Sequence, residues 1–164
     1  MLAMEYGLAQ EEAELLKQAA PMHDIGKIAT PDSVLLKPGR LDDEEMEIMK
    51  QHPNIGHDIL EGSQRPILKA AAIISQQHHE KYDGTGYPNG LKGDEIHIFA
   101  RIVAVADVFD ALTHKRCYKE AWPIEDVIKL FKEESGKHLD AKVVQIMLDN
   151  IDKALEVNAI YQDK

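Results

Sequence analysis

Apolar residues recur every three or four positions over most of this chain, which is the spacing of one face of an α-helix. Between residues 9 and 22, for example, Ala13, Leu16 and Ala20 follow this spacing. Strict alternation of apolar and polar residues, typical of a half-buried β-strand, is absent from the sequence. The pattern therefore predicts an all-α fold, a helical bundle. The predicted helices cover about 9–22, 42–52, 67–80, 98–113, 123–136 and 140–161, with a further turn or two around Ile59 and Leu60.

Residues at the predicted helix ends support these boundaries. Asp42 followed by Glu45 has the spacing of a capping box, in which each residue satisfies a free backbone N–H of the first turn. Pro123 suits the first turn of a helix, and Gly136 suits the end of one. Asp140 is a favourable N-cap for the last predicted helix.

Two stretches are predicted to be loops. Pro31, Pro38 and Gly39 mark the first of them. The second runs from Tyr82 to Gly93 and is about a dozen residues long, and a loop of that length inside a compact domain is usually functional. Its turn-forming residues are Gly84, Gly86, Pro88, Gly90 and Gly93.

Size and composition set limits on the class of protein. The chain has 164 residues, 44% hydrophobic and 29% charged, so we expect residues 1–164 to form one globular domain. Its net charge of −10 argues against non-specific nucleic-acid binding. Cys117 is the single cysteine, which excludes an internal disulfide framework and favours a reducing, cytoplasmic location. Apolar runs fall short of the roughly 20 residues that span a membrane.

Histidine and aspartate residues are the candidates for metal binding. The pair His23-Asp24 ends a predicted apolar helix, and adjacent helical residues point about 100° apart, so the pair suits two neighbouring ions better than one. Asp107 lies in an otherwise apolar helix, where an ionised carboxylate needs a partner or a metal. Asp110 shares that helix face and either joins the site or pairs with a nearby arginine. Imidazole and carboxylate ligands together favour iron, manganese, zinc or nickel over calcium or magnesium.

The potential ligands are spread over four predicted helices. A bundle core that brings them together could hold two metal ions. Each histidine taken singly could equally be a solvated or hydrogen-bonded side chain. The set consists of His23, Asp24, His52, His78, His79 and Asp107.

The motifs, in their order along the chain, resemble those of the HD-GYP family, the metal-dependent phosphodiesterases of cyclic di-GMP. The resemblance covers roughly residues 19–148, and its most specific part is a His-His-Glu run followed by Gly-Tyr-Pro. The matching segments are His23-Asp24-Ile-Gly-Lys27-Ile, Met49-Lys-Gln-His52-Pro-Asn-Ile-Gly56, His78-His79-Glu80-Lys-Tyr-Asp83-Gly84-Thr-Gly86-Tyr87-Pro88, Ala106-Asp107-Val-Phe-Asp110-Ala-Leu and Arg116-Cys-Tyr-Lys119.

The resemblance implies a helical HD-superfamily bundle with the metal site in its core and a glycine-rich loop at the mouth of that site. It implies hydrolysis of cyclic di-GMP to pGpG, and to GMP in some members, by attack of a metal-bridged hydroxide on phosphorus. The centre would contain two or three divalent ions, iron or manganese in most members. The implied site residues are the metal ligands His23, Asp24, His52, His78, His79 and Asp107, the catalytic residues Lys27 and Asp24, the substrate-binding residues Tyr87, Arg116 and Lys119, and the signature loop of Asp83, Gly84, Gly86, Tyr87 and Pro88.

The chain departs from the family pattern in two places. Family members usually have a Glu and a His ligand upstream of the His-Asp pair, and the sequence begins after that point, so we expect an N-terminal truncation that affects a third metal site. Cys117 stands where the family usually has proline. The resemblance also implies an N-terminal sensory or receiver domain in the full-length protein and a diguanylate cyclase as a candidate partner.

Two other functions stay open at this point. One is a different nucleotide phosphohydrolase of the HD superfamily, and the other is a signalling module that binds metal or nucleotide without turnover. We expect Trp122 and Phe131 to belong to the core. The histidines expected to be structural or exposed are His57, His97, His114 and His138.

Overall fold

The computed structural model describes residues 1–115 and 120–162, with side chains up to residue 160. Within these ranges all regular structure is helical, apart from two isolated β-bridges, Asp83 with Lys92 and Ser135 with Leu139. The prediction of an all-α fold is therefore confirmed. None of the described helices is long and apolar enough to cross a membrane.

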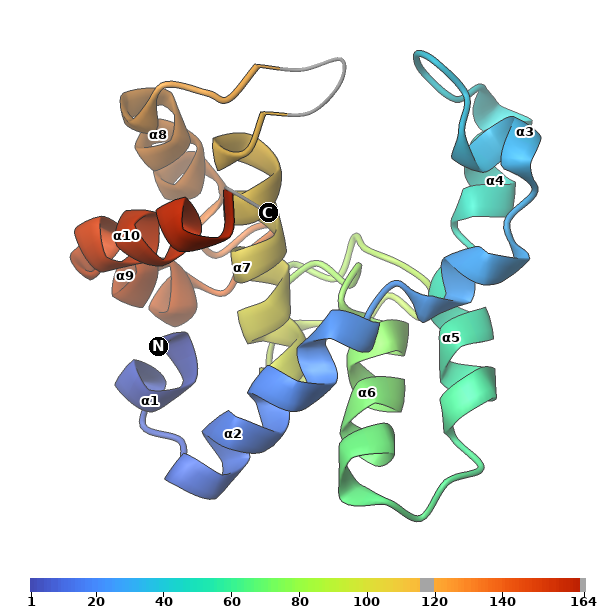
Figure 1. Ribbon diagram of the computed structural model, residues 1–164, viewed down its shortest axis with the longest axis horizontal. Helices are drawn as coiled ribbons and strands as arrows, with labels where there is room; N and C mark the ends of the chain where they lie inside the picture. Colours follow the sequence, from blue (N-terminus) through green and yellow to red (C-terminus); the bar gives the residue numbers. More distant parts are fainter. Residues whose placement is uncertain (116–119, 163–164) are drawn as a thin grey trace.

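The chain is a succession of short helices around one long one (Figure 1). Here α denotes an α-helix and η a 3₁₀ helix. The elements are α1 (Leu2–Tyr6), α2 (Gln10–Ala19), η1 (Ala20–Met22), η2 (Ile25–Ala29), α3 (Asp32–Leu35), α4 (Asp43–Met49), α5 (His52–Leu60), α6 (Pro66–Gln77), η3 (Gly93–Glu95), α7 (Ile98–Thr113), α8 (Ile124–Glu134), α9 (Ala141–Asp149) and α10 (Ile151–Gln162).

Helix α7 is the centre of the fold. Figure 1 shows it between α8, α9 and α10 on one side and α2 and α6 on the other. Apolar side chains from the surrounding helices, including Ile74, Phe131 and Val143, are almost completely buried in one core with it. Burial of each large apolar side chain contributes about 1.5–3 kcal/mol to stability. The apolar surface on nearly all sides of α7 is what allows it to be enclosed in this way.

A buried ion pair connects α7 to α9. The Nη1 atom of Arg101 lies 2.7 Å from Oδ2 of Asp140, which is 4% exposed. The other carboxylate oxygen of Asp140 accepts hydrogen bonds from the N–H groups of Lys142 and Val143, which confirms that Asp140 is the N-cap of α9.

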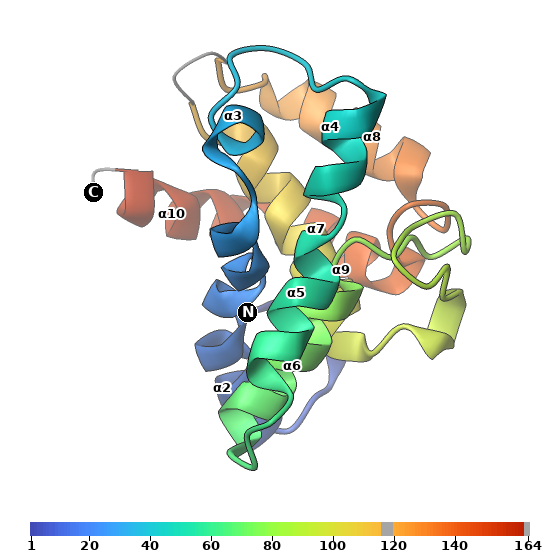
Figure 2. The same ribbon diagram turned by 90° about the vertical axis from the view of Figure 1, so that its right-hand side faces the viewer.

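Glycines allow α5 to approach both η2 and α6 very closely, and Figure 2 shows α5 lying along α6. A Cβ atom on Gly26 would lie 1.9 Å from the carbonyl oxygen of His52. One on Gly56 would lie 2.0 Å from Oγ of Ser75. No larger residue fits at either position without a shift of the backbone or of a buried side chain, so these glycines bring Asp24 and His52 together.

Several boundaries differ from the sequence prediction. The predicted helix over 42–52 is two helices, because the chain turns after Met49 and Pro53 lies in the first turn of α5. The capping box of Asp42 and Glu45 is confirmed. The last predicted helix is interrupted at Asn150, and the first predicted loop contains the short helix α3.

Of the two aromatic residues expected in the core, Phe131 is fully buried and Trp122 is not. Trp122 is 38% exposed, so that expectation is wrong. It lies in the segment between α7 and α8, where its backbone N–H donates to the carbonyl of Leu112 near the end of α7.

Candidate metal centre

The fold brings together all the candidate metal ligands expected from the sequence. Asp24, His52, His78 and His79 each offer a ligand atom within 4.8 Å of the others. His23 and Asp107 adjoin this group, with Nε2 of His23 3.6 Å from Oδ1 of Asp107. The ligands lie between η1 and η2, at the first residue of α5, just after α6 and in the middle of α7.

Asp24 lies at the middle of this cluster, and its two oxygens face different partners. Oδ1 lies 3.2 Å from Nε2 of His52 and 3.4 Å from Nε2 of His78. Oδ2 lies 3.3 Å from Nε2 of His23 and accepts a 2.8 Å hydrogen bond from Nζ of Lys27. A carboxylate arranged in this way can contribute one oxygen to each of two adjacent cation positions.

Backbone carbonyls determine which nitrogen of each imidazole faces the cluster. Nδ1 of His23 donates to the carbonyl of Ala20, at 2.8 Å. In the same way, Nδ1 of His52 donates to Met49 at 2.7 Å. Nδ1 of His78 donates to Ser75, also at 2.8 Å. Because a carbonyl oxygen can only accept, the proton belongs on Nδ1 and Nε2 is left as a potential ligand atom.

The donor set fits a divalent cation. Nε2 of His23 and Oδ1 of Asp24 are buried and have no hydrogen-bond partner. Nε2 of His52 and Nε2 of His78 are 3.4 Å apart, although both face the carboxylate as acceptors. Buried polar atoms without partners are costly, and a cation among them removes that cost. Nitrogen and carboxylate ligands of this kind suit iron, manganese or zinc.

The electrostatics of the cluster also favour a positive charge. Burial by itself lowers the pKa of His23, but the nearby carboxylates of Asp107 and Asp24 outweigh this effect and raise the pKa to about 10. Burial by itself raises the pKa of Asp107, but the contact with His23 has the larger effect, so the pKa of Asp107 lies below its usual value. Burial, together with the neighbouring imidazoles, lowers the pKa of His79 to about 3, so this ring is neutral and able to act as a ligand.

The glycine-rich loop forms one wall of the cluster. The ring of Tyr87 stacks on that of His79, with centroids 5.0 Å apart and an angle of 16° between the planes. The N–H of Tyr87 donates to the carbonyl of His79 at 3.3 Å. A Cβ on Gly86 would lie 2.2 Å from the backbone nitrogen of Lys81, so the loop is packed directly against the segment that carries the ligands.

The other residues of the predicted signature loop stabilise the conformation of the loop itself. Oδ1 of Asp83 accepts from the N–H and the hydroxyl of Thr85, at 3.0 and 2.6 Å. Gly84 has a φ of 87°, which favours glycine, and Pro88 follows Tyr87 through a cis peptide bond. The predicted residues Arg116 and Lys119, and Cys117 between them, lie outside the described residues.

Two residues near the loop were assigned no role from the sequence. Nζ of Lys50 lies 5.5 Å from the centroid of the Tyr87 ring. Glu80 is 2% exposed and accepts hydrogen bonds from the N–H groups of Asn89 and Leu91. Glu80 directly follows the histidine doublet, and this position in the motif was the sequence feature that could have indicated its importance. No signal in the sequence placed Lys50 beside Tyr87, because the two are far apart along the chain.

The remaining histidines lie outside the cluster. His57 faces Asp58 and Glu61 on the surface of α5, and His97 caps α7. Nδ1 of His114 lies 2.9 Å from Oδ1 of Asp110, so among the described residues Asp110 pairs with this histidine and not with an arginine. His138 is half-buried, and its backbone carbonyl accepts the N–H of Tyr82. These positions agree with the expectation that the four histidines are structural or exposed.

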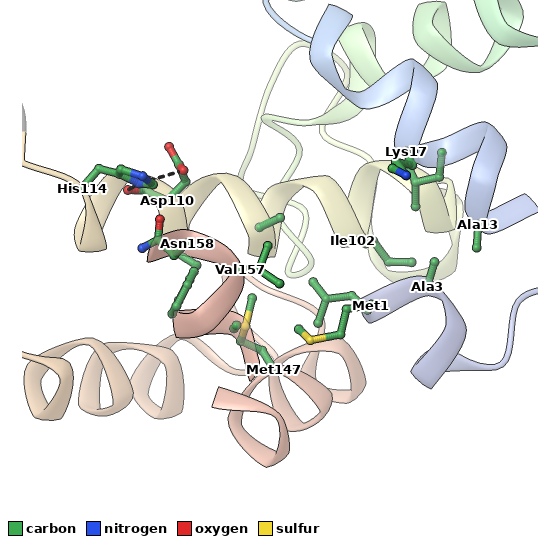
Figure 3. Close-up of a pocket in the computed structure, with 15 residues that line it drawn as sticks. Met1, Ala3, Ala13, Lys17, Ile102, Asp110, His114, Met147, Val157 and Asn158 are labelled. Atoms are coloured by element: carbon green, nitrogen blue, oxygen red, sulfur yellow. Dashed lines mark hydrogen bonds and ion pairs between the residues drawn. The ribbon is translucent and has the colours of Figure 1, made fainter. Parts of the chain in front are cut away.

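An apolar pocket of about 370 Å³ is lined in part by α7 (Figure 3). Ile102, Ala106, Phe109 and Asp110 form its α7 wall, and Asp107 is not part of the lining. Most of the other lining residues are apolar and come from α1, α2, α9 and α10. The pocket thus lacks the clustered ligands found around Asp24.

Comparisons with known proteins agree with this site. The sequence model of the HD domain family matches residues 1–143. The cyclic di-GMP phosphodiesterase response regulator RpfG of Xanthomonas campestris pv. campestris is 50% identical over 148 residues, 90% of this chain and 39% of that protein. The 3'3'-cGAMP-specific phosphodiesterase 2 of Vibrio cholerae is 46% identical over 162 residues, 99% of this chain and 31% of that protein.

Two further matches extend the comparison. A cyclic di-GMP phosphodiesterase of Thermotoga maritima is 49% identical over 147 residues, 90% of this chain and 40% of that protein. The crystal structure of a cyclic GMP-AMP-specific phosphodiesterase of V. cholerae (V-cGAP3) superposes with a TM-score of 0.66 at 19% identity, covering 96% of this chain and 43% of that one, which shows a common fold. The chain spans 31–40% of the three sequence relatives. It belongs to the HD domain family and, by its motifs, to the HD-GYP branch of that family.

Proposed function

We propose that this chain is the phosphodiesterase domain of a protein that hydrolyses cyclic di-GMP to pGpG, with further cleavage to GMP as a second step. The observation that carries the proposal is the cluster around Asp24, in which the Nε2 atoms of His23, His52 and His78 converge on the carboxylate beside Lys27. Relatives named as cyclic di-GMP phosphodiesterases, 50% and 49% identical, support the choice of substrate.

We propose that the cluster holds two or three divalent ions, iron or manganese. The two oxygens of Asp24 support at least two positions, one shared with His52, His78 and His79 and the other shared with His23 and Asp107. When bound, such ions activate water as a nucleophile and neutralise phosphate charge.

The chain's own groups have separate tasks in this proposal. Nζ of Lys27, held by Asp24 and about one-third exposed, lies where it can offset the charge on a phosphate or protonate the leaving oxygen. The backbone carbonyls on the Nδ1 atoms of the histidines keep each Nε2 directed at the cluster. Tyr87 forms a wall of the substrate site, and Arg116 and Lys119 bind the dinucleotide by resemblance to the family.

A second candidate substrate is 3'3'-cGAMP, because the V. cholerae relative specific for that molecule is similar over 99% of this chain. The two cyclic dinucleotides carry the same phosphodiester groups and differ in one base. A metal centre of this kind would act on both, so discrimination depends on the groups that contact the bases.

We further propose a cytoplasmic protein in which a sensory or receiver domain regulates this one, with a diguanylate cyclase as a candidate partner. The relatives are longer than this chain, and one of them is named a response regulator. The net charge of −10 supports a small anionic substrate over nucleic acid, since only the site itself needs positive charge.

The direct test is hydrolysis of cyclic di-GMP and 3'3'-cGAMP by the chain and by the full-length protein, each reduced and loaded anaerobically with Fe(II) or Mn(II). Products are separated by chromatography. We expect pGpG or GMP from cyclic di-GMP, and no product from the Asp107→Ala variant. Binding of cyclic di-GMP without any product from either protein would show a binding module instead, and turnover of 3'3'-cGAMP alone would change the substrate.

A further inference from the structure

Glu80 is a buried carboxylate, and both of its oxygens accept hydrogen bonds from the backbone. Its Oε1 accepts the N–H of Asn89 at 2.7 Å and its Oε2 accepts the N–H of Leu91 at 3.0 Å. At 2% exposure it is shielded from water, so these bonds supply the partners that an ionised carboxylate requires. Hydrogen bonds to a charged acceptor are about twice as strong as neutral ones.

These bonds connect the metal ligands to the loop that covers them. Glu80 directly follows the doublet His78-His79, while Asn89 and Leu91 lie two and four residues after Tyr87. Before Pro88 in the chain, Tyr87 is held by the hydrogen bond from its N–H to the carbonyl of His79 and by the stacking of its ring on that of His79. The loop is therefore attached to one short segment, residues 79–80, on both sides of Pro88.

We infer that Glu80 is a positioning residue that holds the loop in place and so keeps Tyr87 stacked on His79. Without the carboxylate, the N–H groups of Asn89 and Leu91 lose their acceptor, and residues 89–91 lose these two bonds to the segment that carries His79. The consequence for substrate affinity rests on the proposed function, whereas the consequence for the order of the loop does not.

The test compares Glu80→Ala and Glu80→Gln with Glu95→Ala. Gln keeps one acceptor oxygen, so that one of the two bonds can form. Glu95 provides a matched control, because its Oε2 also accepts a backbone N–H, that of Lys92 at 2.9 Å, on the exposed side of the same loop. Hydrogen exchange of the 82–93 amides, bound metal content, and separate KM and kcat values are measured for each variant.

We expect exchange at Asn89 and Leu91 to become at least about tenfold faster in Glu80→Ala, since each amide loses its hydrogen bond to a carboxylate and opens more readily. Glu80→Gln should give an intermediate rate, and Glu95→Ala should leave both amides unchanged. KM should rise several-fold in Glu80→Ala, with metal content retained. Unchanged exchange at these amides in Glu80→Ala would overturn the inference, whether or not the chain hydrolyses any dinucleotide. Loss of protection throughout the chain would also overturn it, since Glu80 would then serve overall folding.

Discussion

The Nε2 atoms of His52 and His78 lie 3.4 Å apart, and each ring donates its Nδ1 proton to a backbone carbonyl. The two Nε2 atoms therefore face the same point, and Oδ1 of Asp24 faces that point as well. Such a group of acceptors is stable only around a positive charge. This geometry, more than the number of histidines, supports the proposal that the cluster is a metal centre.

Replacement of His78 or Asp107 by alanine should abolish metal loading. Each removes a direct contact of the cluster, so the affinity should fall by more than the ~10–100-fold typical of residues that only orient a ligand. Metal content after dialysis, measured by mass spectrometry, checks this. His114→Ala is the matched control, because Nδ1 of His114 pairs with Asp110 outside the cluster. Full metal content in either site variant would remove that residue from the ligand set.

Lys27→Ala should leave the metals bound and slow turnover. Removal of a group that stabilises developing charge typically lowers kcat about 10²–10³-fold. The measurement is kcat together with metal content, and Lys17→Ala serves as control since Lys17 lies on α2 with a side chain that is 77% exposed. An unchanged kcat in Lys27→Ala would show that this lysine takes no part in the chemistry.

Gly26→Ala should disrupt the approach of η2 to α5. The new Cβ would lie 1.9 Å from the carbonyl oxygen of His52, so the backbone must shift, at a cost of about 3 kcal/mol. Because that shift moves His52 away from Asp24, metal affinity should fall as well. Gly62→Ala has no atom within 4 Å of its new Cβ and should change stability by less than about 1 kcal/mol. Equal melting temperatures for the two variants would contradict this account.

The two carboxylates beside Arg101 should differ in their effect on stability. Asp140→Ala leaves a buried guanidinium without its partner and removes the N-cap of α9, so we expect a loss of about 3–5 kcal/mol. Asp94, with a side chain 89% exposed, contacts the same Nη1 atom at 3.1 Å, and Asp94→Ala should cost less than about 1 kcal/mol. Urea denaturation of the two variants gives both values. A larger loss of unfolding free energy in Asp94→Ala than in Asp140→Ala would show that Asp94 is the more important partner of Arg101.

His97 should make the stability of the chain depend on pH. Its Nδ1 accepts the N–H of Phe99 at the start of α7, and burial together with Arg101 lowers its pKa. The unfolded chain, with a pKa near 6.5, therefore binds this proton more readily, and stability should fall as the pH drops below about 6.5 until the folded pKa is passed. His97→Asn retains a capping oxygen that does not titrate and should lose less stability over that range. If thermal denaturation showed the same loss of stability on acidification for the unchanged chain and for His97→Asn, this role of His97 would be contradicted.

Much of the site could be predicted from the sequence because its ligands lie in short, specific motifs. Helical spacing indicated the helices, and the order of the motifs indicated His23, Asp24, His52, His78, His79 and Asp107 together. The boundaries were less certain, since a continuous polar and apolar pattern over 42–52 does not show that the chain turns after Met49. Trp122 was misjudged because an aromatic residue next to a helix can lie on either side of the packed layer.

The helical class of this protein, its family and the residue types at its centre can be read from the sequence, because these depend on local periodicity and on contiguous motifs. The positions of Asp24 between three imidazoles, of Asp110 beside His114 and of Glu80 beneath Asn89 and Leu91 become visible in the folded chain alone. These contacts join segments whose approach depends on the space left by Gly26 and Gly56 and on the packing around α7. Packing of this kind is a property of the whole chain, which no local pattern records.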